Sequence, residues 1–198
     1  KHVPLVEANI VEGLRKANSN ERRFGDYMYA RHVPERNAKY ADSQVVGTVD
    51  SVKGDYTGFE YNGLVGNEAA RAMMDSLTPQ ERKTFEILAR RLDESRQEIL
   101  RLELDNGLID RNTYYRLGGL DASGQPVPGA YQYYVPLLTR GAIDNAISAV
   151  GITGRWTKAE NPTNSLLLQL DQRLSRVQRA KSLQTLLEAL ERTPLPDL

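Results

Sequence analysis

The sequence predicts an all-α fold, a helical bundle with two long amphipathic helices and a connector rich in glycine, tyrosine and proline. Two observations support this prediction. The segments 79–105 and 163–192 place leucines and other apolar residues at spacings of three and four, which is typical of a helix with one buried face. The segment 118–160 between them lacks that periodicity and carries many turn-forming residues. We therefore expect a single helical domain over residues 1–198.

Residues 1–42 are expected to form the N-terminal helices. One helix is predicted over 4–17, because apolar residues recur there at helical spacing. A second helix starts near Ser19. Pro34 has no amide hydrogen and disfavours a helical conformation at the residue before it. We therefore expect a break or kink there, with Pro34 opening a short helix through Tyr40.

Residues 43–66 are rich in glycine and other turn formers, and we expect them to form an ordered Gly-rich loop. A small hairpin is the alternative. In that arrangement residues 45–49 form one strand and residues 56–61 form its partner.

A long helical hairpin is predicted over 67–117. Asn67 is expected to cap a short helix that reaches Ser76. The next helix starts at Thr78, because Thr-Pro-Gln-Glu is a capping box in which the Thr78 hydroxyl accepts from the Glu81 amide and the Glu81 carboxylate reaches back. This helix spans about 27 residues, or roughly 40 Å at 1.5 Å per residue.

The long helix carries a heptad seam with one polar member, formed by Phe85, Leu88, Leu92, Ser95, Ile99 and Leu102. Its charged residues, Asp93 and Glu103 among them, are expected to lie on a solvated face. Asn106-Gly107 ends the helix as a left-handed cap. Asp110 is then expected to cap a short helix, which completes the hairpin.

The sequence YQYYVPL at 131–137 lies in the connector 118–160. Pro136 rules out a regular helix through this stretch, and two earlier prolines hold its approach extended. We expect a structural joint that crosses the bundle and inserts a tyrosine into the core, with a binding surface as the alternative. The candidate joint residues are Tyr133, Tyr134, Val135, Pro136 and Leu137.

The C-terminal helix is predicted over 161–192 and begins at Asn161-Pro162. Its apolar seam consists of Leu167, Leu170, Leu174, Val177, Leu183, Leu186, Leu187 and Leu190. We expect this seam to pack against the other long helix inside one bundle. The alternative is that one seam is an exposed stripe that docks a partner or a second copy.

The composition excludes several kinds of function. There is no cysteine, which excludes disulfides, thiolate metal sites and a cysteine nucleophile. No run approaches the ~20 apolar residues that a membrane-spanning helix needs. The 26 basic residues balance the 26 acidic residues, so no overall charge attracts the chain to nucleic acid or to anionic lipid.

No catalytic residue, cofactor or metal site is predicted. His32 and Glu35 lie three residues apart, but a metal site needs three or four ligands and the only other histidine is His2. The glycines at 63–67 lack the lysine and hydroxyl residue of a phosphate loop. We therefore expect that the chain is not an enzyme.

Arginines and tyrosines alternate near the N-terminus, and surfaces of this kind can hold single-stranded nucleic acid. The candidate contacts are Arg22, Arg23, Arg31 and Arg36. The alternative is that the tyrosines, which recur at helical spacing, belong to the core.

Several short motifs follow one another in a fixed order. They are YMYARHVPERN at 27–37, NEAA at 67–70, NGLI at 106–109 followed by Tyr114, YVPL at 134–137, and GR at 154–155 ahead of AENP at 159–162. Together, over roughly residues 20–192, they resemble a helical region of the large polyvalent proteins of phages and mobile elements. This chain has Val33 where that region usually has alanine.

The resemblance implies a very large multidomain phage protein that is packaged inside the capsid and ejected with the DNA into the host cytoplasm or envelope. Catalytic activities of such proteins belong to other domains, and no residues here match those domains. The chain, which opens without a methionine, is accordingly expected to be a fragment.

The expected function is a non-enzymatic structural or interaction module that acts in virion assembly or genome ejection. Its partners would be other domains of the parent protein or other virion proteins. The alternative is a nucleic-acid-binding accessory module that protects or handles incoming DNA.

Overall fold

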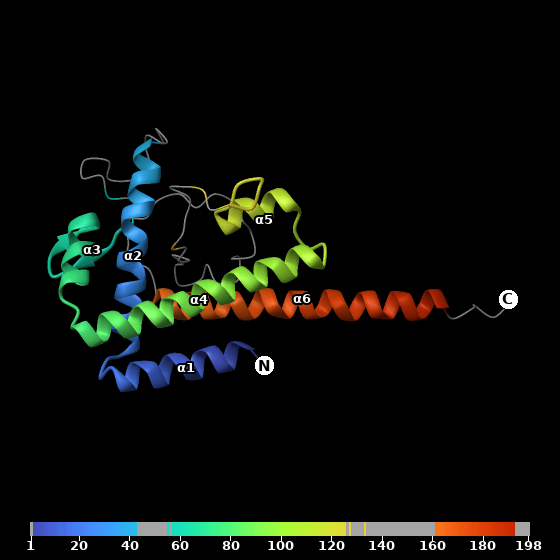
Figure 1. Ribbon diagram of the computed structural model, residues 1–198, viewed down its shortest axis with the longest axis horizontal. Coiled ribbons are helices and arrows are strands. Elements are labelled where there is room, and N and C mark those ends of the chain that lie inside the picture. The colour runs from blue at the N-terminus through green and yellow to red at the C-terminus, as the bar shows by residue number, and fades with distance from the viewer. Residues whose placement is uncertain are drawn as a thin grey trace.

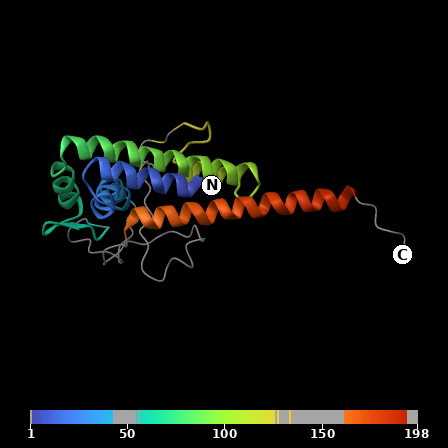
Figure 2. The ribbon, with the colours of Figure 1, turned by 90° about the horizontal axis from the view of Figure 1, so that it is seen from below.

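The computed structural model describes residues 2–42, 55, 57–125, 127, 133 and 161–192. This part of the chain is mostly helical, as the sequence predicts, with one very small two-stranded sheet. The elements, in chain order, are α1 (His2–Lys16), α2 (Glu21–Asp42), β1 (Glu60–Tyr61), β2 (Leu64–Val65), α3 (Gly66–Asp75), α4 (Pro79–Asp105), α5 (Arg111–Gly118) and α6 (Pro162–Arg192) (Figure 1). The axes of α1, α4 and α6 lie roughly parallel, with the chain of α1 running opposite to that of α4 and α6, and α2 crosses them near one end (Figures 1 and 2).

The turn between α1 and α2 forms where the sequence places polar stop and cap residues. Asn18 adopts a left-handed conformation with φ of 51°, which asparagine tolerates better than most residues. The side chain of Asn20 then accepts a hydrogen bond from the amide of Arg23 at 3.0 Å, in the first turn of α2. The polar turn therefore both ends the first helix and starts the second.

The expected break at Pro34 is wrong, because α2 continues through Pro34 to Asp42 as one helix. The proline ring lies on the exposed side of α2, whereas Tyr29 and Val33 are fully buried on the other side. Packing of that apolar side against the rest of the molecule outweighs the cost of one missing backbone hydrogen bond. Local propensity is a weak guide when tertiary contacts oppose it.

A small hairpin precedes α3, and its first strand lies within the strand suggested at 56–61, but that strand pairs with residues that the sequence does not suggest. Strand β1 pairs with β2, in the register Glu60 with Val65 and Tyr61 with Leu64. The two linking residues are asparagine and glycine, both with positive φ, as a tight hairpin turn requires. The other strand proposed from the sequence, at 45–49, lies outside the described residues.

Helix α3 starts without the asparagine cap that the sequence suggests. Its N-cap is Val65, which makes no side-chain capping hydrogen bond. Asn67 lies inside the first turn, where its side-chain oxygen accepts a hydrogen bond from the amide group of Asn37 at 3.0 Å. Asn67 therefore joins α3 to α2 instead of capping its own helix.

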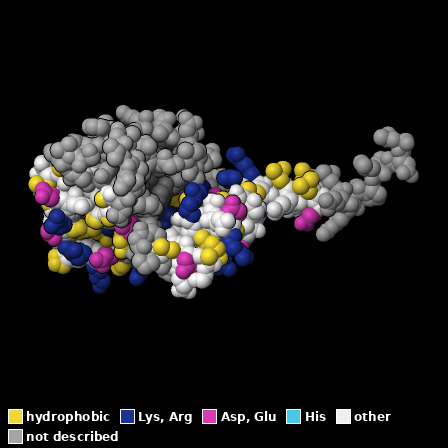
Figure 3. Space-filling model, turned by 90° about the horizontal axis from the view of Figure 1, so that it is seen from above, with side chains coloured by type: hydrophobic (Ala, Val, Ile, Leu, Met, Phe, Trp, Pro, Cys, Tyr) yellow, Lys and Arg dark blue, Asp and Glu magenta, His cyan; other side chains and the backbone are white. Residues whose placement is uncertain are grey.

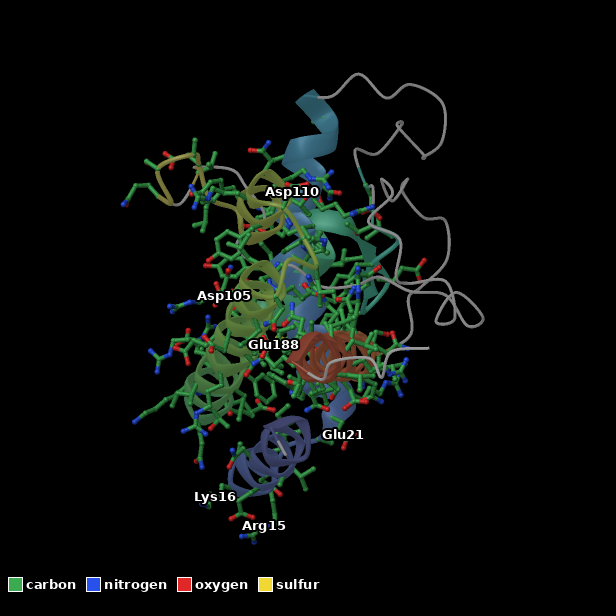
Figure 4. All side chains as sticks on the ribbon, turned by 90° about the vertical axis from the view of Figure 1, so that its right-hand side faces the viewer. Arg15, Lys16, Glu21, Asp105, Asp110 and Glu188 are labelled. Atoms are coloured by element: carbon green, nitrogen blue, oxygen red, sulfur yellow. The ribbon has the colours of Figure 1, made fainter. Side chains whose placement is uncertain are left out.

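Helix α4 begins and ends as predicted. The hydroxyl of Thr78 accepts from the amide of Glu81 at 3.2 Å, and the amide of Thr78 donates to the Glu81 carboxylate at 2.9 Å. The helix stops at Asp105, and Gly107 follows with φ of 66°. Asp110 then caps α5 by accepting from the amide of Thr113 at 2.7 Å (Figure 4).

The hydrophobic core joins α1, α2, α3, α4 and the first part of α6. Its centre includes an aromatic cluster in which the rings of Phe24 and Tyr27 each lie 5.3 Å from the ring of Phe85, between centroids. Close aromatic packing of this kind stabilises a core beyond the area that it buries. A second aromatic contact, between Tyr29 and Phe59, fixes the segment before the hairpin against α2.

Helix α6 has two halves with different surroundings. In the first half, Leu166, Leu170 and Val177 are buried against the other helices. Beyond Val177 the helix extends clear of α1 and α4, and both views in Figures 1 and 2 agree on this. The expectation that the whole seam packs inside the molecule is therefore wrong for its second half.

Candidate functional site

The arginines singled out by the sequence do not form one surface. Among the four, only Arg22 is exposed, whereas the side chain of Arg36 is buried. Arg23 and Arg31 each bind a carboxylate of α4. The nucleic-acid contact remains a prediction, and in the described residues Arg22 is the member of the set that faces solvent.

Arg23 and Glu81 form the centre of a polar cluster at the start of α4. The Arg23 Nε atom lies 2.6 Å from Glu81 Oε1, and Arg23 Nη2 donates to the carbonyl of Ser76 at 2.8 Å. Burial alone would raise the pKa of Glu81, but hydrogen bonds from Arg23 and from Thr78 lower that pKa to about 2. Glu81 therefore serves as helix cap and as anchor for α2, and its carboxylate is not free for chemistry.

Arg31 and Asp93 form a second pair between α2 and α4, with Arg31 Nη2 and Asp93 Oδ2 2.7 Å apart. Burial raises the pKa of Asp93, and the charge of Arg31 offsets only part of that rise. The other oxygen, Oδ1, is buried and accepts no hydrogen bond from the described residues. A buried acceptor in this state costs free energy unless a donor reaches it.

Tyr133 is the one residue of the predicted joint that the structure describes, and it lies against α2. Its ring stacks on the guanidinium of Arg31 at 4.2 Å, and its amide donates to the carboxylate of Glu35 at 3.1 Å. The ring remains 38% exposed, so Tyr133 covers α2 from outside and does not enter the core. Tyr134, Val135, Pro136 and Leu137 lie outside the described residues.

A groove of about 580 Å³ lies beside the Arg31–Asp93 pair, between α2, α3 and α4. Its lining is mostly apolar and includes Tyr27, Ala70 and Met74. Its charged lining residues are three arginines and three carboxylates, namely Arg31, Arg71, Arg90, Asp75, Glu86 and Asp93. The described lining residues thus carry no net charge that would select a ligand, and they include no serine, threonine, cysteine, lysine or histidine.

The carboxylate of Glu103, expected on a solvated face, is instead buried and 1% exposed. It binds the guanidinium of Arg173 on α6, with Nε and Oε1 3.1 Å apart. A sequence signal for this existed, since Leu92, Arg96, Ile99 and Glu103 follow one another at spacings of four, three and four. The buried face of α4 therefore includes two charged residues that a search for apolar periodicity overlooks.

The second half of α6 carries the most exposed leucines in the described chain. Leu183, Leu186 and Leu187 are 60%, 55% and 59% exposed. Figure 3 shows hydrophobic and basic side chains side by side on this projecting part of the molecule. Isolated exposed leucines are common, but three on adjacent helical turns form a contiguous apolar stripe.

The described residues hold no group of three or more histidine, aspartate or glutamate side chains that could bind a metal ion. None of the described helices is both long enough and apolar enough to span a membrane. No protein-family model, no curated protein and no solved structure matches the chain. Among the described residues, the projecting half of α6 is a helical segment that packs against no other helix.

Proposed function

We propose that this chain is a helical bundle that serves as a non-enzymatic interaction module in a phage virion-associated protein, ejected with the DNA and acting in assembly or genome ejection. The observation that supports an interaction role is the leucine stripe on the projecting half of α6. Exposed apolar patches rimmed by polar residues are typical of surfaces that bind other proteins.

The placement of the charged residues supports a non-enzymatic role. Catalytic groups need to converge on a space where a substrate can bind. In the described residues, Glu81, Asp93 and Glu103 each hold an arginine of another helix, so their charges join helices to one another. The virion context is supported by the ordered motifs over residues 20–192 alone.

Quantitative mass spectrometry of purified particles tests this proposal. We expect peptides from this chain in DNA-filled particles at a constant ratio to the major capsid protein. We also expect them to be lost from particles that have ejected their DNA in vitro. Absence from washed, DNA-filled particles, or full retention after ejection, contradicts the proposal.

A further inference from the structure

The exposed leucines of α6 share one face of the helix with two arginines. At about 100° per residue, Arg176 and Arg179 point within about 35° of the mean direction of Leu183, Leu186 and Leu187. Lys181 and Glu188 point about 145° or more away from that direction. We call the five residues that point together the leucine–arginine face: Arg176, Arg179, Leu183, Leu186 and Leu187.

Both arginines of this face are available for binding. Their side chains are exposed, and Arg179 makes no ion pair or hydrogen bond with any described residue. Among the described residues, Arg176 makes only a long contact of 3.5 Å with the carbonyl of Leu108. The face therefore presents an apolar stripe that continues, toward the body of the molecule, into two arginines that no described carboxylate pairs with.

We propose that the leucine–arginine face binds an acidic amphipathic helix of another protein. The leucines would contact the apolar stripe of that helix, and Arg176 and Arg179 would bind carboxylates at its end. A helix lying along an amphipathic groove or face is a common mode of peptide recognition. This inference rests on the proposed function, because it names the kind of partner that the interaction module binds.

The charge of the face argues against two other occupants. A second copy of α6 would add two more arginines and no described acidic residue on the same face, so its charges would repel or stay unpaired. A helix lying on a membrane keeps its basic residues on the polar side, away from the apolar face. Here the arginines lie on the apolar face itself, which suits a protein partner with carboxylates.

Fluorescence anisotropy with two synthetic peptides tests the proposal on the full 198-residue chain. Both peptides are amphipathic helices of about 20 residues with the same leucine stripe, long enough to cover the face. One has glutamates beside the stripe and the other has lysines. We expect the glutamate peptide to bind about tenfold more tightly at low salt, with the difference shrinking as salt is added.

Three variants serve as comparisons. The double variant R176E/R179E should reverse the preference between the peptides, and L183S/L187S should abolish binding of both. The matched control K181E/E188K changes charge on the opposite face and should bind like the wild type. Circular dichroism of each variant confirms that α6 is intact.

Equal binding of the two peptides, no binding, or a preference that R176E/R179E leaves unchanged would overturn the inference. A dimer of the wild type in sedimentation equilibrium that dissociates in L183S/L187S would also overturn it, since a second copy would then occupy the face. The proposed virion role fails separately. It is contradicted by absence from DNA-filled particles, whatever the peptides do.

Discussion

The guanidinium of Arg173 binds the buried carboxylate of Glu103 and thereby joins α6 to α4, with Nε donating to Oε1 at 3.1 Å. Val177, one turn later, is the last buried residue of α6 among those described. The ion pair thus lies close to the point where α6 leaves the core. It divides the helix into an anchored half and a projecting half.

Arg173→Met should lower the free energy of unfolding by about 3–5 kcal/mol, because Glu103 would remain as an uncompensated buried charge. Urea denaturation measures this change. The double variant R173M/E103L should recover most of the loss, since a buried ion pair can be replaced by apolar residues at little cost. Arg90→Ala is the control and should cost less than about 0.5 kcal/mol, because the pair Arg90–Glu94 is exposed and 3.9 Å apart.

Gly25→Ala should destabilise the protein by about 1–3 kcal/mol, because a side chain there would be overpacked. An added Cβ would lie 2.5 Å from the side-chain oxygen of Asn161, at the start of α6. In an Asn161→Ala background the same change should cost much less, since the clash is gone and alanine favours the helix. Equal costs in both backgrounds, measured by urea denaturation, would show that α2 and α6 do not approach each other here.

Thr78→Ala should cost about 1 kcal/mol, which is typical for loss of a helix N-cap. Asp110→Ala should cost a similar amount or less, because Asp110 caps only the short helix α5. Thermal unfolding followed by circular dichroism compares the two variants. A larger loss for Asp110→Ala than for Thr78→Ala would contradict the roles of these caps.

Acid should destabilise the protein in two stages, through His32 and then through Glu81. Burial, aided by the charge of Arg36, lowers the pKa of His32 to about 3, so the unfolded chain binds a proton below its ordinary pKa of 6.5 and the folded chain does not. The free energy of unfolding should therefore fall as pH drops below about 6.5, by at most about 1.4 kcal/mol per pH unit for one proton.

The pKa of Glu81 is lowered from 4.5 to about 2, so its contribution to stability is present above pH 4.5 and is lost as pH falls toward 2. Urea denaturation across the pH range measures both stages. His32→Gln should flatten the change between pH 6.5 and 4.5, and Glu81→Gln should flatten the change below 4.5. An unchanged slope in either variant would contradict the assignment of that stage.

The sequence predicts those parts of the fold that local chemistry decides. The capping box at Thr78, the glycine after α4 and the cap at Asp110 all act within a few residues, and all three occur where predicted. Pro34 and Asn67 mislead because contacts from elsewhere in the fold decide their roles. Packing against residues distant in sequence keeps α2 helical past Pro34. A hydrogen bond from Asn37, 30 residues earlier, holds the side chain of Asn67.

Hydrophobic periodicity does not predict that the leucines in the projecting half of α6 are exposed. The seam of α6 has apolar residues in both halves, but periodicity does not say how far the neighbouring helices extend. Because α4 ends at Asp105, the leucines beyond Val177 have no described helix to pack against. The spacing of Glu103 is consistent with its burial, but periodicity does not identify its partner Arg173, which is 70 residues away.

The free energy of unfolding of the triple variant L183S/L186S/L187S tests most directly whether the projecting half of α6 is a binding surface and not part of the core. We predict that the three substitutions together change it by no more than about 1.5 kcal/mol, since surface substitutions usually stay within about 0.5 kcal/mol each. The single core variant Leu166→Ala, in the anchored half, should cost about 2–5 kcal/mol in the same urea titration. A loss for the triple variant as large as that for Leu166→Ala, or larger, would contradict this, because the leucines would then be buried within the protein itself.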